Sequence, residues 1–578
     1  MKRSIVYFII YILLSIEVSA QSIINPVDSF YDDLQVWDAM GLVPALPPLR
    51  PYPEALVKSI LKTVMEGDSS LQGEEARRHY ERLFGKPLNL AAEGIGTAKV
   101  NEAEDRQEQV NVSAIAFGSL PVLNIFSISY DLNLLLSNKA PGEEIIPKNS
   151  GYAYDIYKDT ADIGPFSVYA GFNTSAAANY KNVLWLQGGV SRSSWGDFYD
   201  NGVVIGPNAI HAGNISLVIH QQKWNYTLAL FLLSASSDVP TNPYTRPYPE
   251  KFMSLHSIGY SPWDWLSLTV YENAVFGQRF EPLYLLPISP FMVSQELIGV
   301  SDDNIQMGLS FKIKPLKGLS WATNIFLDDA QFNDMVRFKF DTKIRTAVQS
   351  GITWAPSFPF ISLVQLDYTL ITPYTYTHED DSDDGINYQN YTNNGRSLGA
   401  AIPPNSDRIS LTGKFEPFKT LKVNTSAVFI RHANVNESLP WDVAAPYLYS
   451  ANSVYSDGGI LDSPNAGEGY FDYAHHHLMF MEQDTKQYIT QLGLDLLWEL
   501  PPLTFGTITF SLGYMFEYIY NDGVDRNMFT GYELAVPPPG GHTQAVIQQK
   551  ISDAKSEWKN NLSNRLNHYL TLGMRLLF

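Results

Sequence analysis

The chain has 578 residues, 40 Lys and Arg against 60 Asp and Glu (a formal net charge of −20), 13% aromatic residues and no cysteine. The acidic balance excludes a nucleic-acid-binding protein, which needs a basic surface, and the absence of cysteine excludes disulfide scaffolds and thiolate metal sites. A hydrophobic content of 45% argues against disorder, and after the first twenty residues no apolar run reaches the roughly 20 residues that a membrane-spanning helix needs.

The first twenty residues are typical of a secretory signal peptide. Lys2 and Arg3 form a positively charged start, and residues 5–16 are an apolar run that is too short for a membrane anchor. The small residues at 18–20 then suit a signal-peptidase site. We therefore predict that residues 1–20 are a signal peptide and that the mature chain is exported.

Residues 21–90 have the periodicity of short α-helices. Apolar residues recur there every three or four positions, which predicts one helix with Ser29 as its N-cap, a second from Pro53 and a third from Glu74 to Phe84. Three short helices with one apolar stripe each are too small to hold a core alone, so we expect them to pack against the rest of the chain. The stripes of the first two helices are Phe30, Leu34, Trp37 and Met40, and Leu56, Val57, Ile60, Leu61, Val64 and Met65.

From residue 91 onward the pattern changes to the two-residue alternation of β-strands. Apolar residues occupy every second position over long stripes with aromatic residues near their ends, which is typical of a barrel wall with lipid outside and water inside. The last stripe ends on Phe578 and looks like the last-strand signal that the barrel-insertion machinery of outer membranes reads. The eighteen segments that we predict are 94–101, 108–119, 123–137, 164–176, 181–191, 213–221, 224–234, 252–260, 265–275, 305–314, 319–328, 343–354, 359–372, 407–416, 420–431, 486–500, 504–518 and 565–578.

The connections between these segments alternate between short and long. If Phe578 lies on the periplasmic side, every short turn lies there and every long connection lies outside, a sorting for which a β-sandwich gives no reason. We therefore predict that residues 91–578 form an all-β transmembrane barrel of about 18 antiparallel strands, a monomer in contact with outer-membrane lipid. Residues 21–90 are then a periplasmic helical segment or a plug that prevents free diffusion, with a small docking domain as the alternative.

Three groups of residues, spread over most of the mature chain, are similar to one known family. They are Met40-Gly41-Leu42-Val43 before Pro51-Tyr52-Pro53; Glu272-Asn273-Ala274-Val275-Phe276-Gly277 with Pro287, Glu296 and Asp303-Asn304 after it; and the run from Tyr391 to Gly399 before Pro404-Asn405-Ser406-Asp407. They resemble the Wzi capsule-assembly family. The resemblance implies an eighteen-stranded outer-membrane barrel with a periplasmic helical portion, acting as a lectin that holds extracellular or capsular polysaccharide at the cell surface. An outer-membrane porin or solute channel is the alternative function.

Two long connections, 373–406 and 432–485, contain the residue types that bind sugars. Flat aromatic faces pack on the C–H surfaces of sugars, and planar amides and carboxylates hydrogen-bond their hydroxyls. We predict that both connections are exterior, although any single Tyr can instead belong to an aromatic girdle or to loop packing. The candidate polysaccharide-binding residues are Tyr374, Tyr376, Tyr388, Tyr391, Asn387 and Asn390 in the first connection, and Trp441, Tyr447, Tyr449, Tyr470 and Tyr473 in the second.

The run from Glu379 to Gly385 contains five carboxylates and partly resembles a calcium loop. The twelfth position counted from its first Asp is Tyr391 rather than the expected Glu, so a solvated acidic tip is the alternative. A bound Ca²⁺ could bridge the acidic loop to an anionic polymer, and we expect no other cofactor. The candidate calcium ligands are Asp380, Asp381, Asp383 and Asp384.

No pattern in the chain predicts catalysis. The three histidines His475–His477 could ligate zinc with Asp472 and Glu482, but adjacent histidines in a loop are more often incidental. No local motif places a His beside a nucleophile, and neighbouring carboxylates such as Asp328 and Asp329 face opposite sides of a strand. We therefore expect that the protein is not an enzyme.

Overall fold

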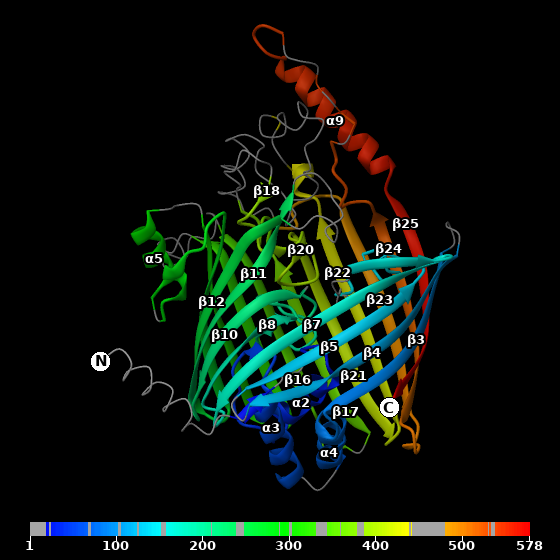
Figure 1. Cartoon of the computed structure of the whole chain (residues 1–578). Coiled ribbons are helices and arrows are strands. Elements are labelled where there is room, and N and C mark those ends of the chain that lie inside the picture. Colours follow the sequence, from blue (N-terminus) through cyan, green and yellow to red (C-terminus); the bar gives the residue numbers. More distant parts are fainter. Residues whose placement is uncertain are drawn as a thin grey trace.

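Eighteen antiparallel strands form a closed barrel in the computed structural model (Figure 1). Each predicted segment corresponds to one of these strands, and the barrel is confirmed. The structure describes residues 19–21, 25–67, 71–101, 106–123, 126–140, 142–151, 158–209, 211–237, 248–287, 289–299, 303–330, 344–358, 360–378, 386–438, 441, 480–529, 531–532, 534 and 538–578. The wall strands are β3 (Leu88–Asn101), β4 (Gln107–Leu123), β5 (Phe126–Ser137), β7 (Phe166–Tyr180), β8 (Leu184–Ser191), β10 (Ala212–His220), β11 (Trp224–Ser237), β12 (Tyr248–Trp263), β13 (Leu266–Gly277), β14 (Asn304–Leu316), β15 (Leu319–Ala330), β16 (Ile344–Trp354), β17 (Ile361–Ile371), β21 (Ser406–Phe418), β22 (Leu421–Ala433), β23 (Lys486–Glu499), β24 (Thr507–Asp522) and β25 (Ser563–Leu577).

The sheet closes where the last wall strand meets the first. β25 pairs antiparallel with β3 from Asn567 opposite Asn101 to Leu577 opposite Ala91. Closure leaves no free edge, so the backbone N–H and C=O groups of the wall have partners in a medium that offers none. The C-terminus lies at the end of the barrel where the connections are short (Figure 1).

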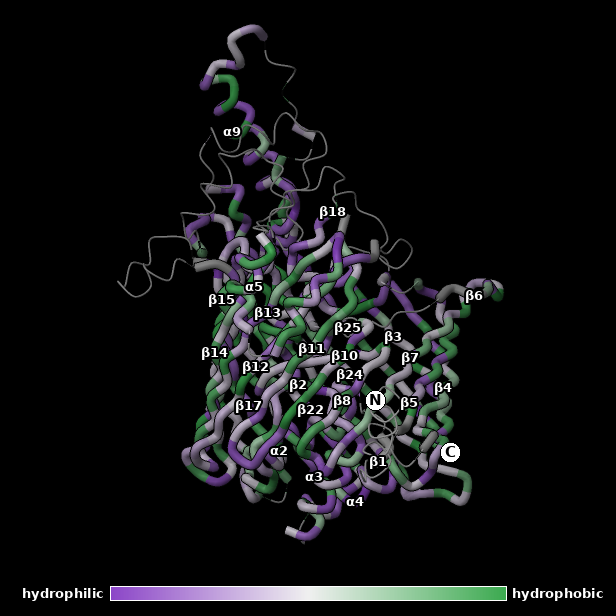
Figure 2. The backbone as a smooth tube through the Cα atoms, turned by 60° about the vertical axis from the view of Figure 1, so that its left-hand side comes forward, coloured by the Kyte–Doolittle hydropathy of each residue, from purple (hydrophilic) through white to green (hydrophobic). Residues whose placement is uncertain are grey.

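The two faces of the wall differ in polarity, as the alternation predicts. Hydrophobic and hydrophilic residues follow one another along the wall strands (Figure 2). At the short-turn end, exposed Trp263, Trp265 and Trp498 belong to an aromatic girdle of the kind that marks a membrane interface. Outward apolar side chains above it, all more than a third exposed, include Leu134, Leu186, Ile215, Val270, Leu366, Leu411, Leu494, Leu512 and Leu572. Buried polar side chains on the inner face include Gln187, Asn214, Asn273, Gln306, Asn324, Gln365, Gln487, Gln491 and Glu517.

Three helices fill the short-turn mouth of the barrel: α2 (Ser29–Ala39), α3 (Glu54–Gly67) and α4 (Leu71–Phe84) (Figure 1). The predicted helical segment is confirmed, except that the N-cap of α2 is Asp28, whose carboxylate accepts from Phe30 N. The helices do not hold a separate core, because Trp185 and Val218 of the wall belong to the same cluster of buried side chains. None of the helices in the described residues is long and apolar enough to cross a membrane.

The long connections contain secondary structure that the sequence did not predict. Helix α5 (Phe291–Ile298) follows the 3₁₀ turn η1 (Pro282–Leu285), and α9 (Gln544–Asn560) projects from the long-loop end (Figure 1). α9 was missed because it is polar almost all round: its buried side chains are Ile547, Ala554 and Trp558. The signal peptide at residues 1–20 stays a prediction; all but Ser19 and Ala20 lie outside the described residues.

An arginine on the outer face should destabilise the barrel more than an arginine on the inner face. Leu494 points outward and is 41% exposed, whereas Thr571 points into the lumen, where its hydroxyl meets that of Thr97. We expect Leu494→Arg to cost about 2–4 kcal/mol of unfolding free energy near the bilayer midplane and Thr571→Arg to cost far less. Guanidinium titrations in lipid vesicles measure both. Equal costs would contradict the assignment of the two faces.

Candidate functional site

The lumen of the barrel is closed by chain that enters from both ends. From the long-loop end, the described parts of two connections fold inward: 192–209 and 211 of the connection 192–211 between β8 and β10, and 372–378 and 386–405 of the connection 372–405 between β17 and β21. The expectation that every long connection lies outside was therefore wrong for these two. The physical reason is that they carry large apolar side chains that bury one another inside the wall. These include Trp195, Val203, Val204, Ile205, Tyr376, Tyr391, Leu398 and Ile402.

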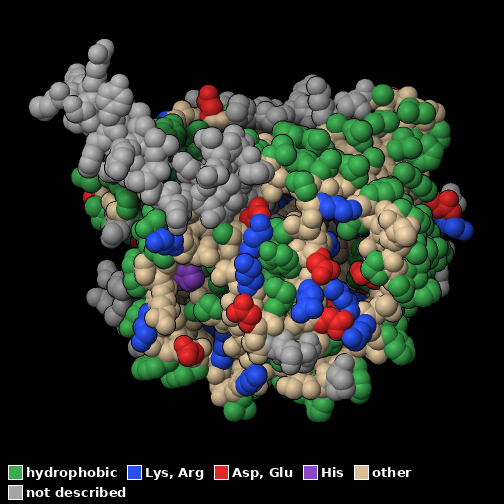
Figure 3. All heavy atoms as spheres, turned by 60° about the horizontal axis from the view of Figure 1, so that its bottom comes forward, with side chains coloured by type: hydrophobic (Ala, Val, Ile, Leu, Met, Phe, Trp, Pro, Cys, Tyr) green, Lys and Arg blue, Asp and Glu red, His purple; other side chains and the backbone are tan. Residues whose placement is uncertain are grey.

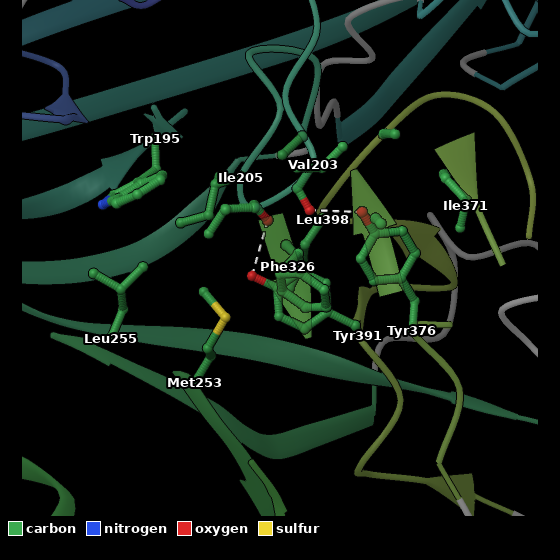
Figure 4. Close-up of a cluster of buried hydrophobic side chains, with 14 of the residues drawn as sticks. Trp195, Val203, Ile205, Met253, Leu255, Phe326, Ile371, Tyr376, Tyr391 and Leu398 are labelled. Carbon is green, nitrogen blue, oxygen red and sulfur yellow. Dashed lines mark hydrogen bonds between the residues drawn. The ribbon is translucent and has the colours of Figure 1, made fainter. Parts of the chain in front are cut away.

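Two tyrosines lock the inward connections together (Figure 4). Tyr376 Oη donates to Val203 O at 2.6 Å, and Tyr391 Oη donates to Val204 O at 2.8 Å. The two rings are stacked, with centroids 5.5 Å apart, and both pack against Phe326 of β15. Burial raises the pKa of both hydroxyls, so they remain donors. We call this arrangement the tyrosine lock.

The backbone at the tyrosine lock is held in an unfavourable conformation. Tyr374 and Tyr376 have φ angles of 60° and 75°, in the left-handed region that costs a bulky residue about 1–3 kcal/mol. Asp328 accepts a hydrogen bond from Tyr376 N at 2.6 Å and fixes this conformation. At Gly399 a Cβ atom would lie 2.7 Å from the Tyr376 ring, so glycine permits the close approach.

A buried lysine ties the same connection to the wall. Lys251 of β12 donates to Asn390 O at 2.6 Å, Asn390 Oδ1 at 2.7 Å and Thr392 Oγ1 at 3.1 Å. All three acceptors are neutral, so these hydrogen bonds compensate for the loss of water around the ammonium group. Asn273 Nδ2 of β13 donates to Tyr391 Oη at 3.3 Å. The motif runs that begin at Glu272 and Tyr391 therefore meet in the lumen.

The first group of predicted sugar-binding residues is not on an exterior surface. Their side chains are at most 8% exposed, because the described part of connection 372–405 folds into the lumen. The placement of the described part of this connection outside was therefore wrong; binding by these residues stays a prediction that would require the connection to open. The residues are Tyr374, Tyr376, Tyr388, Tyr391, Asn387 and Asn390.

The second group falls mostly outside the described residues. Trp441 is described, and 36% of its surface is exposed. Among the described residues no group of three or more His, Asp or Glu could hold a metal ion. Predicted residues outside the described part are Tyr447, Tyr449, Tyr470 and Tyr473, the acidic residues Asp380, Asp381, Asp383 and Asp384, and the histidines His475–His477.

Ion pairs dock the helices in the mouth, where charged side chains of both signs gather (Figure 3). Asp38 of α2 lies between Lys312 at 3.0 Å and Lys314 at 2.6 Å, both on β14. Lys312 also contacts Asp197 of the inward connection at 2.6 Å. One lysine of the wall therefore joins the helices to the chain that enters from the opposite end.

Further contacts extend this docking. Lys414 and Lys422, on neighbouring strands β21 and β22, pair with Asp32 at 2.7 Å and Asp33 at 3.4 Å. Arg50, in the short strand β2 (Leu49–Arg50), donates to Gly196 O at 2.8 Å in the inward connection. Acidic residues of α2 thus face lysines of the wall. The sequence analysis did not predict these ion pairs between α2 and the wall. The signal in the sequence was the group of Asp residues in α2 together with the lysines on the strands that face it.

A cavity of about 500 Å³, lined by both polar and apolar side chains, remains between the helices and the wall. This volume falls in the range of about 300–1,000 Å³ that small-molecule sites occupy. The side chains that line it offer hydrogen-bond donors and acceptors of the kinds that sugar hydroxyls or water can use. They include Asp28 and Arg82 of the helical segment, Ser129, Tyr130, Asn133, Asn173 and Thr174 of the wall, and Arg192 and His211 near the inward connection.

Comparison with known proteins supports the fold. No protein-family model matches the chain, and no curated protein matches it. Among solved structures it is similar to Wzi from Escherichia coli, an outer membrane protein involved in group 1 capsule assembly and a carbohydrate-binding β-barrel. The TM-score is 0.52 at 12% identity, and the match covers 96% of this chain and 98% of Wzi. At this identity the similarity establishes the fold alone, that of an outer-membrane barrel.

Two other solved structures from Pseudomonas aeruginosa are less similar. OccD3 (OpdP) has a TM-score of 0.38 at 9% identity, with 86% of this chain and 92% of that chain covered. The outer membrane protein OprD has a TM-score of 0.38 at 8% identity, with 85% and 94% covered. Neither likeness carries an argument about this chain.

Removing the positive charge of Lys312 should loosen the helices. Lys312→Met leaves Asp197 without this cation and Asp38 with Lys314 alone, and breaking a buried pair in this way costs about 3–5 kcal/mol. We expect faster amide hydrogen exchange in α2. Lys419→Met is the matched control, since Lys419 is 66% exposed in its pair with Glu74 and should matter little. Equal protection of α2 in both variants would contradict this role.

The docking of the helices should fail in acid. Burial raises the pKa of Asp38, but Lys312 and Lys314 outweigh burial and lower it to about 2; Arg82 does the same for Asp28. A lowered pKa means that the stabilisation is complete above the unfolded value of about 4 and is lost as the pH falls through about 2. The protection factors of the α2 amides, which correct for the intrinsic pH dependence of exchange, should fall between pH 5 and pH 2. Asp38→Asn should reduce the pH dependence of this protection. If protection of α2 in the parent chain does not change with pH, the prediction is refuted.

Proposed function

We propose that this protein is an outer-membrane lectin-like barrel that binds extracellular or capsular polysaccharide at the cell surface and takes part in capsule assembly. The observation that carries the proposal is the closure of the lumen from both ends. The helical segment occupies the short-turn mouth, and the tyrosine lock holds two connections across the interior. A barrel whose lumen is closed at both ends is poorly suited to passing solutes. It is better suited to holding a ligand on its outer end. The similarity to Wzi supports the same function.

The proposal assigns binding to the long-loop end. Trp441 supplies an exposed aromatic face there, of the kind that packs against the C–H surface of a sugar ring. The net charge of −20 would repel an anionic polymer, so we include Ca²⁺ as a bridge between the acidic run and the polymer. We further propose that the protein is a monomer and has no enzymatic activity.

A porin or solute channel is the second candidate. The cavity of about 500 Å³ beside β4, β5, β7 and β8 favours it, because a hydrated path along this side of the lumen would suit small solutes. Such a path has to pass the helices at one end and the inward connections at the other. The two candidates therefore differ in what the intact barrel conducts.

Binding of capsular and extracellular polysaccharides to the purified, intact barrel tests the proposed function. We expect Trp441→Ala to bind several-fold more weakly, because it removes the exposed ring. Trp498→Ala is the matched control: this Trp is 51% exposed in the lipid-facing girdle, so its loss should leave binding unchanged. Removal of Ca²⁺ with a chelator should release anionic polymers. A barrel that binds no polysaccharide in this assay contradicts the proposal.

Conductance in planar bilayers separates the two candidates. The parent barrel should conduct little, whereas Tyr376→Phe combined with Tyr391→Phe should open intermittently. The double variant loses two hydroxyl-to-carbonyl hydrogen bonds, each worth about 0.5–1.5 kcal/mol. Tyr518→Phe, on the lipid-facing side and 38% exposed, is the control that should behave like the parent. Steady, cation-selective conductance of the parent barrel would favour the porin instead.

A further inference from the structure

The described part of the connection between β13 and β14, residues 278–287, 289–299 and 303, folds over the outside of the barrel wall. On β12, Met253 and Leu255 belong to the cluster of buried side chains inside the barrel, so Ser254 and His256 point outward. Ser254 is nevertheless fully buried, and its hydroxyl donates to Tyr284 O at 2.7 Å. This connection therefore covers the face of the wall that other strands present to lipid. Figure 1 shows α5 beside the strands, outside the barrel.

The covered part of the wall is an apolar cluster with an ionisable pair beside it. Leu230, Ala274 and Phe276 of the wall pack against Tyr284 and Phe291 of the connection. These wall side chains share the outward face with Ser254 and His256. The connection is thus attached to the wall by a packed interface of its own.

The ionisable pair lies under the first residue of α5. His256 Nε2 and Glu272 Oε2 are 3.1 Å apart, and Phe291 N donates to the same Glu272 oxygen at 2.8 Å. The Phe291 ring stacks on the His256 ring, with centroids 4.3 Å apart and an angle of 18° between the planes. The connection therefore caps an outward-facing charged or polar pair that lipid could not hydrogen-bond.

The position of this pair along the wall puts it at the depth of the hydrocarbon. Tyr260, 52% exposed, lies near the girdle residue Trp263, and His256 is four positions further up β12. His256 is seven positions from Trp263 itself, and a rise of ~3.4 Å per residue with a tilt of ~40° puts it about 18 Å above the girdle. This height is in the outer half of an apolar band about 25 Å tall. The part of the connection over His256 is therefore level with the lipid-facing wall.

The exposed side chains of α5 are apolar apart from Glu296 near its end. Met292, Val293 and Leu297 of α5 are 54%, 51% and 73% exposed, and Leu286 before the helix is 47% exposed. No charged residue occurs between Glu281 and Glu296. An exterior loop in water would leave these side chains without a partner, whereas the outward wall beside them is already apolar.

We propose that the described residues 278–287 and 289–299 belong to a membrane-inserted segment, whose helix α5 lies in the outer leaflet against the acyl chains of its lipids. The covered side of the segment shields the His256–Glu272 pair, and the free side extends the lipid-facing band of the wall. The partner of this surface is lipid. The inference is independent of which ligand the barrel binds.

Spin labels can measure the environment of α5, because the chain has no cysteine and one introduced Cys gives a unique site. Leu297→Cys, labelled in lipid vesicles, should collide with dissolved oxygen more than with a water-soluble nickel complex. Val270→Cys on the wall and Ser552→Cys on α9 provide lipid and water references, since both positions are exposed. Nickel accessibility like that of Ser552→Cys overturns the proposal. Spin–spin broadening at Leu297 also overturns it, because the partner would then be a second copy.

A second experiment tests the shielding. Phe291→Ala removes the cap from the ionisable pair, so the guanidinium midpoint of unfolding in vesicles should fall. The same substitution in a chain that carries His256→Leu and Glu272→Leu should lower the midpoint by less, because no pair remains to be shielded. An equal shift in both backgrounds means that Phe291 only fills space and contradicts the shielding.

Discussion

The requirement that a sheet in lipid has no free edge determines the rest of this structure. Hydrocarbon offers no hydrogen bonds, so β25 has to pair with β3 and every wall strand has to present apolar side chains outward. Each strand then turns its other side chains inward, where they line a bore wide enough to hold three helices and two folded connections. The interior thus contains an apolar cluster around Trp195 and Phe326 as well as rows of Asn, Gln and charged side chains.

Buried charged and polar groups in the lumen are compensated by partners close to them. Asp38 is paired with two lysines, Lys251 with three oxygen atoms, and the strained backbone of Tyr376 with the carboxylate of Asp328. Each contact joins the wall to a segment that entered from one end. The outer side of the wall has one similar contact, where Phe291 N donates a hydrogen bond to the outward-facing Glu272. Segments that lie against the wall are therefore fixed by polar contacts at their ends and by apolar packing between them.

The sequence predicted the wall well because strand alternation is a local signal. In β23, Leu492, Leu494 and Trp498 are exposed, as the alternation predicts, and Ile489 on the opposite face is buried in the apolar cluster of the lumen. The spacing of apolar residues predicted the helices in the mouth equally well. It did not predict where the candidate site residues lie. Tyr376 and Tyr391 have the same local pattern whether they lie on an exterior platform or in an interior lock, and only the apolar partners from residues 203–205 decide between them.

Lys312 has a consequence for how the two ends of the barrel communicate. Its ammonium group contacts Asp38 from the helices in the short-turn mouth and Asp197 from the connection that enters at the opposite end. Any force or ligand that displaces Asp197 changes the environment of the cation that Asp38 needs, and the coupling is reciprocal. The two mouths of the barrel are thereby coupled through a single side chain.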